Sequence, residues 1–254
     1  MTLDLSGVTI VFDLDGTLVD TAPDLAAAAN HVFASLGLAA IPPGEMRPFI
    51  SHGARAMIEQ GLHRHGVTKT PEELAELFER FIPYYADNVA VLSRPFEGIP
   101  ELLDALLEAG ARLAVCTNKY EALSRSLLRQ LALHDRFVAI AGRDTFDVFK
   151  PAPGHLTRTI ALAGGQTERA IMVGDSEVDI ATAAAAGIPS IGVTFGYTQV
   201  PVRDLRPTAV IDHYREFMPA LERALAAGRG SVATSEAHPD VAEPRQPGLG
   251  LWQS

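Results

Sequence analysis

The first apolar run of the chain, Val8 to Phe12, has the length and β-rich composition of a buried strand. It ends in the segment 13–17, where alternation along an extended chain would place Asp13 and Asp15 on the same side. Gly16 then allows the chain to turn sharply. Two carboxylates at the end of a buried strand are unfavourable unless a positive group meets them, and a metal ion is the simplest such group. Two solvated turn aspartates are the alternative.

The next stretch, from residue 21 to about residue 89, has apolar residues at helical spacing and little strand signal. A helix is expected over 25–36, closed by Gly37. A second helical stretch is expected over 45–65, interrupted at 51–53. Thr70, followed by proline and two acids, begins a third. We interpret residues 21–94 as an inserted, all-helical cap domain.

Strand-like and helical runs alternate from residue 95 onward. This alternation predicts a parallel sheet with helices on both faces. The expected fold class is therefore α/β, with a Rossmann-like parallel sheet core formed by residues 1–20 and 95–228. The expected strands are 111–116, 137–141, 170–173, 188–193 and 209–211, and the expected helices are 99–109, 120–131, 153–163, 177–186 and 215–227.

The last segment, residues 229–254, is rich in Gly, Pro, Ser and Ala and lacks periodicity. Such a composition predicts a disordered tail. The alternative is a short docking segment, in which Trp252 would occupy an apolar groove.

Composition narrows the classes of protein to which the chain can belong. With 47% hydrophobic residues, the 254-residue chain can bury a full core. No apolar run approaches the ~20 residues that span a membrane, and no signal segment is evident, so a cytoplasmic protein without membrane contact is expected. A net charge of -10 without a basic cluster argues against nucleic-acid binding. The single cysteine, Cys116, excludes an internal disulfide and a multi-cysteine metal site. The oligomeric state, monomer or homodimer, stays open.

Polar side chains recur where the expected strands end. Thr117 and Asn118 follow one strand, Asp175 follows a later one with Asp179 one helical turn beyond, and Lys150 lies in a loop. Taken singly, Thr117 or Asp175 could cap a helix, and Lys150 could be solvated. Ligands of open parallel sheets, however, bind at the carboxyl ends of the strands. These side chains are therefore expected to converge in one site.

Together these segments resemble the four motifs of the haloacid dehalogenase-like hydrolase superfamily in order and spacing. The resemblance covers roughly residues 8–225, and the helical block matches that superfamily's inserted cap. Within the superfamily the chain looks most like bacterial phosphoglycolate phosphatases, although Asp147 stands where many relatives have proline. The motifs are Asp13-x-Asp15-Gly16-Thr17, Thr117-Asn118, Lys150-Pro151-x-Pro153 and Gly174-Asp175-Ser176-x-x-Asp179.

A carboxylate nucleophile is repelled by a phosphate monoester, by about 4 kcal/mol for each pair of unit charges at ~4 Å. Its attack therefore needs cations. Asp13 and Asp175, with a backbone carbonyl near Asp15, offer the hard oxygen ligands that suit Mg²⁺. The resemblance implies that Asp13 is the nucleophile, through an aspartyl-phosphate, and that Asp15 is general acid and then general base.

The other motif residues suit phosphate binding. The Thr117 hydroxyl and the Asn118 backbone N–H can bind phosphoryl oxygens, and Lys150 can stabilise the charge of the transition state. Asp179 is expected in the surrounding shell, where it would position Lys150 or a metal-bound water.

The implied function is Mg²⁺-dependent hydrolysis of small phosphorylated metabolites, with 2-phosphoglycolate as the expected substrate. His52 and Arg55, at the break in a cap helix, could bind a substrate carboxylate, unless the break is structural and Arg55 is solvated. A sugar phosphomutase would use both aspartates but needs a second phosphate site in a cap that has few basic residues. A haloacid dehalogenase would not be expected to carry Asp15. A non-enzymatic binding protein on this scaffold would be expected to have lost an acid or Lys150.

Overall fold

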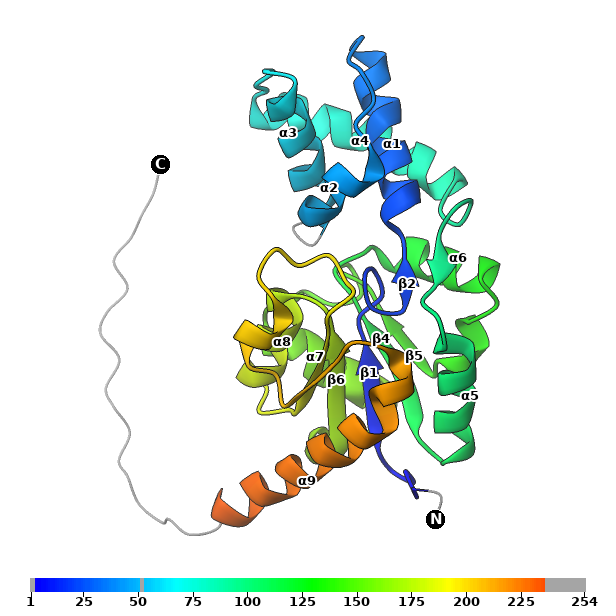
Figure 1. Ribbon diagram of the computed structural model, residues 1–254, viewed down its shortest axis with the longest axis vertical. Helices are drawn as coiled ribbons and strands as arrows, with labels where there is room; N and C mark the ends of the chain where they lie inside the picture. The colour runs from blue at the N-terminus through cyan, green and yellow to red at the C-terminus, as the bar shows by residue number, and fades with distance from the viewer. Residues whose placement is uncertain (1–2, 51–52, 236–254) are drawn as a thin grey trace, which may run out of the picture.

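The computed structural model describes residues 3–50 and 53–235, and its centre is a parallel sheet (Figure 1). Six strands pair in the order β5-β4-β1-β6-β7-β8, and every pairing is parallel. The predicted α/β fold with a parallel core is therefore confirmed. The strands are β1 (Thr9–Phe12), β4 (Arg112–Cys116), β5 (Ala139–Ala141), β6 (Ala170–Gly174), β7 (Ser190–Val193) and β8 (Ala209–Ile211).

Helices cover both faces of this sheet because successive strand residues point to opposite faces. Ile10 and Phe12 belong to one apolar cluster, in which Phe12 stacks on Phe217 at 5.9 Å between ring centroids. Val11 belongs to the other cluster, together with Leu156. The core helices are α5 (Ile99–Glu108), α6 (Glu121–Gln130), α7 (Pro153–Leu162), α8 (Glu177–Ala185) and α9 (Phe217–Ser235). Short 3-10 turns lie at His134–Arg136, Thr167–Arg169, Val202–Leu205 and Tyr214–Glu216.

The last helix, α9, continues past its expected end at residue 227. A glycine costs about 1 kcal/mol relative to alanine inside a helix, which does not stop a helix that is already formed. Gly228 lies where α9 approaches Pro189, since an added Cβ would be 3.1 Å from the proline Cγ. Residues 229–235, expected in a disordered tail, thus belong to a helix. The rest of that tail lies outside the described residues.

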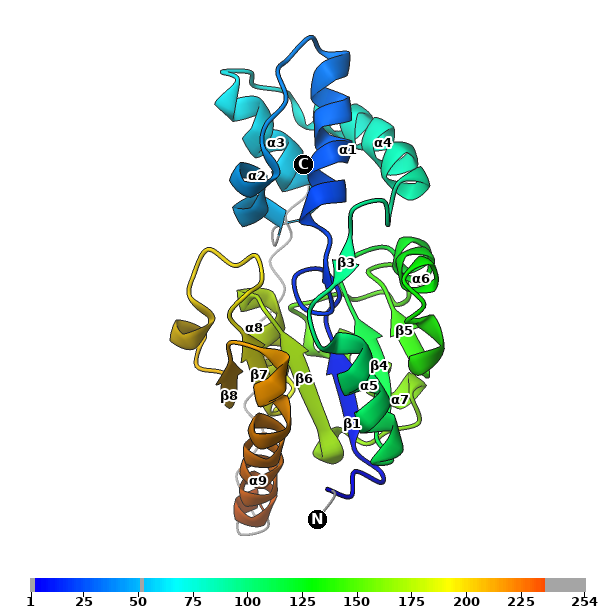
Figure 2. The same ribbon diagram turned by 45° about the vertical axis from the view of Figure 1, so that its right-hand side comes forward.

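Within the described residues, four helices between β2 (Val19–Asp20) and β3 (Arg94–Pro95) in the chain lie beyond the carboxyl edge of the sheet, at the top of Figures 1 and 2, and we call them the cap helices. The first packs against the other three. An antiparallel ribbon of β2 and β3 joins them to the sheet; two residues per strand are too few for the sequence pattern to predict. The cap helices are α1 (Ala22–Ser35), α2 (Pro43–Ile50), α3 (Ala54–Arg64) and α4 (Pro71–Asp87). Within residues 3–50 and 53–235, none of the helices is long and apolar enough to cross a membrane.

Candidate active site

A cavity of about 640 Å³ lies between the cap helices and the carboxyl edge of the sheet. Most of the side chains singled out in the sequence line it, although they come from segments far apart in the chain. Asp179 is fully buried outside the lining, and His52 lies outside the described residues. The lining includes Asp13, Asp15, Arg55, Thr117, Asn118, Lys150 and Asp175.

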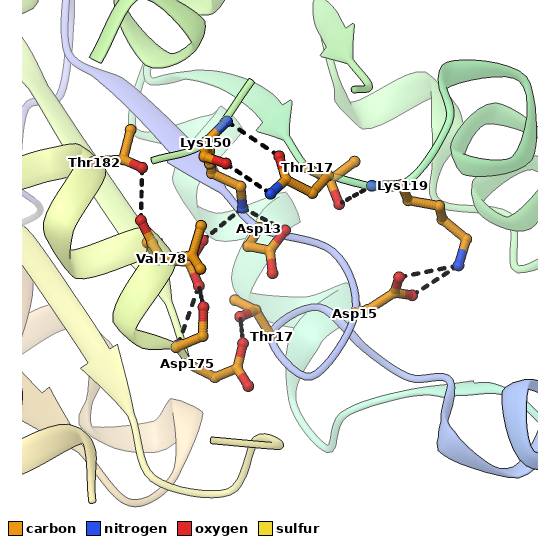
Figure 3. Close-up of polar contacts among 12 residues, drawn as sticks. Asp13, Asp15, Thr17, Thr117, Lys119, Lys150, Asp175, Val178 and Thr182 are labelled. Carbon is orange, nitrogen blue, oxygen red and sulfur yellow. Dashed lines mark hydrogen bonds and ion pairs between the residues drawn. The ribbon is translucent and has the colours of Figure 1, made fainter. Parts of the chain in front are cut away.

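Three buried carboxylates form a cluster on the sheet side of the cavity. Ligand oxygens of Asp13, Asp175 and Asp179 lie within 4.8 Å of one another. The Lys150 ammonium enters this cluster and donates to Asp13 Oδ1 at 2.8 Å (Figure 3). It also donates to Asp179 Oδ1, at 2.5 Å. We call these four side chains the carboxylate cluster.

The charges of this cluster do not balance. Burial raises the pKa of Asp13 to about 6. Burial, reinforced by the charges of Asp179 and Asp13, raises the pKa of Asp175 well above its usual range. Burial opposes the charge of Lys150, but its two carboxylate partners outweigh that effect and raise its pKa. Ionising all three carboxylates beside one ammonium would leave two negative charges, and a cation such as Mg²⁺, for which these hard oxygen donors are suited, would offset them.

Asp175 is held in place by neighbours from two loops. It accepts hydrogen bonds from Thr17 Oγ1 at 3.2 Å and from the Tyr197 backbone N–H at 2.7 Å. A Cβ added to Gly196 would lie 2.2 Å from Asp175, and one added to Gly16 2.7 Å. The close approach of both loops to this carboxylate therefore depends on glycine. In addition, the Tyr197 hydroxyl donates to Asp20 Oδ1 at 2.7 Å, which ties the same loop to the base of the cap helices.

Asp15 lies two residues after Asp13 but faces a different partner. Strand β1 ends at Phe12 and Gly16 has φ +83°, so strand alternation no longer applies to Asp15. Its two carboxylate oxygens each accept a hydrogen bond from Lys119 Nζ at 3.0 Å (Figure 3). Its side chain is therefore outside the carboxylate cluster, and only its backbone is left as an oxygen donor toward a metal.

Lys119 is a site residue that the sequence reasoning did not assign. Its ammonium also donates to the Tyr85 hydroxyl on α4, at 2.7 Å, and lies 4.5 Å from the centre of that ring. The available signal was its position directly after Thr117-Asn118 at the end of β4. No sequence pattern indicated a role for Tyr85 in the site, because a tyrosine at helical spacing is typical of an ordinary core residue.

The loop that carries Lys150 is fixed by side-chain contacts. Asn118 donates through Nδ2 to the Lys150 carbonyl at 2.9 Å and accepts from the Lys150 N–H at 3.1 Å. His155 Nδ1 also accepts from that N–H, at 3.2 Å, and burial lowers the pKa of His155 to about 4, so the ring is neutral. The Asn118 side chain is thus occupied, while its backbone N–H has no acceptor in residues 3–50 and 53–235.

On the cap side, the cavity is bordered by α3 and α4. Arg55 of α3 is exposed, and its guanidinium lies 5.0 Å above the ring of Phe78. Phe81 and Tyr85 of α4 continue the same wall. The wall is thus largely aromatic, with Arg55 among its charged groups.

Comparison with known proteins gives concordant results. A sequence model of the family described as haloacid dehalogenase-like hydrolase matches residues 10–193. A phosphoglycolate phosphatase of Mesorhizobium japonicum is 49% identical over 213 residues, covering 83% of this chain and 92% of that protein. Another, of Agrobacterium fabrum, is 46% identical over 223 residues, covering 88% and 95%. The crystal structure of a predicted phosphoglycolate phosphatase from Haemophilus somnus superposes with a TM-score of 0.77 at 26% identity, covering 85% of this chain and 97% of that one.

Proposed function

Because this chain belongs to the haloacid dehalogenase-like hydrolase family, we propose a mechanism in which Asp13 attacks the phosphorus of a small phosphate monoester. The chain is a phosphoric monoester hydrolase, in line with its close similarity to proteins named phosphoglycolate phosphatase. The observation that carries the mechanism is the place of Asp13: its carboxylate lines the cavity, 2.8 Å from Lys150 and inside the carboxylate cluster.

Phosphate binding is assigned to groups at the ends of β4 and of the loop before α7. The Thr117 hydroxyl and the Asn118 backbone N–H donate to phosphoryl oxygens, and the Lys150 ammonium faces the charge that develops on them. Asp179 is a positioning residue, because it accepts a hydrogen bond from the Lys150 ammonium at 2.5 Å and is itself held by hydrogen bonds from Ser176. Mg²⁺, when held by the carboxylates of Asp13 and Asp175, supplies the positive charge that lets an anionic nucleophile approach an anionic substrate.

Asp15 is assigned the proton transfers. In the first step, an oxygen of Asp13 bonds to phosphorus while the bond to the leaving oxygen breaks, and Asp15 gives that oxygen a proton. In the second step, Asp15 takes a proton from the attacking water, which releases phosphate and regenerates Asp13. The separation of the Asp15 side chain from the carboxylate cluster supports this division, because a carboxylate engaged by a metal would not be free to exchange protons.

We propose 2-phosphoglycolate as the substrate, by analogy with the relatives' names. The test is a panel of small phosphate esters assayed with and without Mg²⁺. The expected result is Mg²⁺-dependent release of phosphate with the highest kcat/KM for 2-phosphoglycolate, and no turnover of any ester by Asp13→Asn. Full turnover in excess chelator, or an active Asp13→Asn variant, would contradict the mechanism. Conversion of a sugar 1-phosphate to the 6-phosphate without net phosphate release would instead identify a phosphomutase.

A further inference from the structure

Among the described residues, four cationic side chains line the cavity, and they differ in how they are held. Lys150 is committed to the carboxylate cluster. Arg55 and Arg143 are exposed, and each guanidinium lies above an aromatic ring, at 5.0 and 4.0 Å from its centre. Lys119 is different, since its side chain is only 5% exposed although it lines the cavity. A lysine buried to this extent is unfavourable unless it has defined partners.

The partners of Lys119 place it beside the leaving group. Its Nζ is 3.0 Å from both oxygens of Asp15, the residue assigned to protonate the leaving oxygen. A general acid must lie within about 2.6–3.2 Å of the oxygen that it protonates. The Lys119 ammonium is therefore within about 6 Å of that oxygen, and it lines the same cavity as Asp15.

Tyr85 supplies a second donor at the same place. Its hydroxyl accepts a hydrogen bond from Lys119 at 2.7 Å, and its own proton has no acceptor within the parts of the chain that the structure describes. Burial, together with the charges of Asp15 and Asp24, raises the pKa of Tyr85 well above its usual range, so the phenol keeps this proton. An ammonium and a hydroxyl thus adjoin each other in the cavity, next to Asp15.

We propose that Lys119 and Tyr85 bind the carboxylate of the substrate, and that the enzyme thereby selects phosphate esters of 2-hydroxy acids. This inference rests on the proposed phosphatase function. In such esters the carboxylate is attached to the carbon that bears the ester oxygen, which puts it in reach of Lys119 when that oxygen faces Asp15. The three donor hydrogens of the ammonium face Asp15 Oδ1, Asp15 Oδ2 and the Tyr85 hydroxyl, so one of the two bonds to Asp15 is exchanged for a bond to the substrate carboxylate, and the ammonium then bridges the two carboxylates.

An ion pair between Lys119 and the substrate carboxylate should change substrate affinity by a measurable amount. A hydrogen bond to a charged group in a protected site changes affinity by roughly 10- to 100-fold, and one to a neutral group by roughly 3- to 10-fold. The corresponding assay compares kcat/KM for 2-phosphoglycolate and 2-hydroxyethyl phosphate, because these esters differ only in the carboxylate. We call the ratio of the two values the carboxylate preference.

Lys119→Met is expected to lower the carboxylate preference about 10- to 100-fold, and Tyr85→Phe about 3- to 10-fold. Arg143→Met, which removes one positive charge from the same cavity, is the matched control and should retain the preference. Tyr85→Phe keeps the buried ring, so it also tests the inference if Lys119→Met fails to fold.

Three results would overturn the inference. An equal loss on both esters in Lys119→Met, with an unchanged preference in Tyr85→Phe, would mean that Lys119 acts only through Asp15. Loss of the preference in Arg55→Met but not in Lys119→Met would move carboxylate binding to the cap. A wild-type enzyme that hydrolyses both esters equally would refute the proposed substrate itself. Failure of the proposed substrate is therefore seen in the wild type, whereas failure of the roles of Lys119 and Tyr85 is seen only in the variants.

Discussion

The charge imbalance of the carboxylate cluster makes a prediction about stability rather than activity. Asp175→Asn removes one negative charge from three carboxylates that share a single ammonium. Without metal, the variant should be more stable than the wild type, because repulsion inside the fold is relieved. With saturating Mg²⁺, the order should reverse, because only the wild type retains a full set of ligands.

The magnitude follows from the distances. At 4.8 Å and an effective dielectric constant near 20, two carboxylates repel by about 3.5 kcal/mol. Asp175→Asn removes two such repulsions and weakens one attraction to Lys150. The net gain in the free energy of unfolding is therefore of the order of one such repulsion. Relaxation and water penetration reduce it further, to about 1–3 kcal/mol. Mg²⁺ at about 1,000 times its Kd should stabilise the wild type by about 4.1 kcal/mol, which exceeds this gain and amounts to several degrees or more in Tm.

The assay is urea unfolding followed by circular dichroism, in excess chelator and in Mg²⁺. It is run at about pH 8, where Asp13, with a pKa of about 6, is ionised. Asp15→Asn is the matched control: its side chain faces Lys119, so the variant should keep the Mg²⁺-dependent gain. If Asp175→Asn gained as much from Mg²⁺ as the wild type, or were less stable than it in chelator, the charge argument would be refuted.

Two further variants test the roles of neighbouring residues. Asp15→Asn should release nearly one equivalent of nitrophenol from p-nitrophenyl phosphate in a burst and then turn over slowly, since this leaving group hardly needs an acid while hydrolysis of the intermediate needs the base. Stopped-flow absorbance and the added phosphate mass on the peptide with Asp13 are the readouts, and a label on another residue would contradict the assignment. Gly196→Ala should lower kcat at least 10-fold and weaken Mg²⁺ binding, because the added Cβ would fall 2.2 Å from Asp175. Calorimetric titration measures the affinity for Mg²⁺. An unchanged affinity would contradict the prediction and show that the loop shifts to make room for the methyl group.

The part of the site that the sequence predicted is the part that follows from topology. Parallel strands end at one edge of a sheet, so Asp13, Thr117 and Asp175 could be placed near one another from strand order alone. The structure brings them to the same cavity. Lys150 comes from a loop, and its placement rested on motif resemblance instead of on periodicity. The helices were predictable for a related reason, since their apolar spacing and caps are local in sequence.

The part that was missed depends on contacts between separate layers. Lys119 meets Asp15 across 104 residues and Tyr85 across 34, and the second contact exists only because α4 lies above the end of β4. No local pattern encodes how cap helices sit over a sheet. The same reason hid Tyr197, whose backbone N–H binds Asp175 while its hydroxyl binds Asp20. Sequence therefore predicted the charged residues of the carboxylate cluster, but not that Lys119 neutralises Asp15.

Pairing of charges explains how two aspartates, two residues apart, can take different roles. Asp13 shares Lys150 with two other carboxylates, so its surroundings stay negative and call for a cation. Asp15 has Lys119 to itself among the carboxylates of the described residues, so its surroundings are already neutral and provide no reason to recruit a metal through its side chain. Stepwise phosphoryl transfer requires a nucleophile that faces a cation site and an acid–base group that lies outside it. The lysine that neutralises Asp15 is the one that we propose binds the substrate carboxylate, so in this proposal the charge balance that separates the two aspartates would also serve substrate recognition.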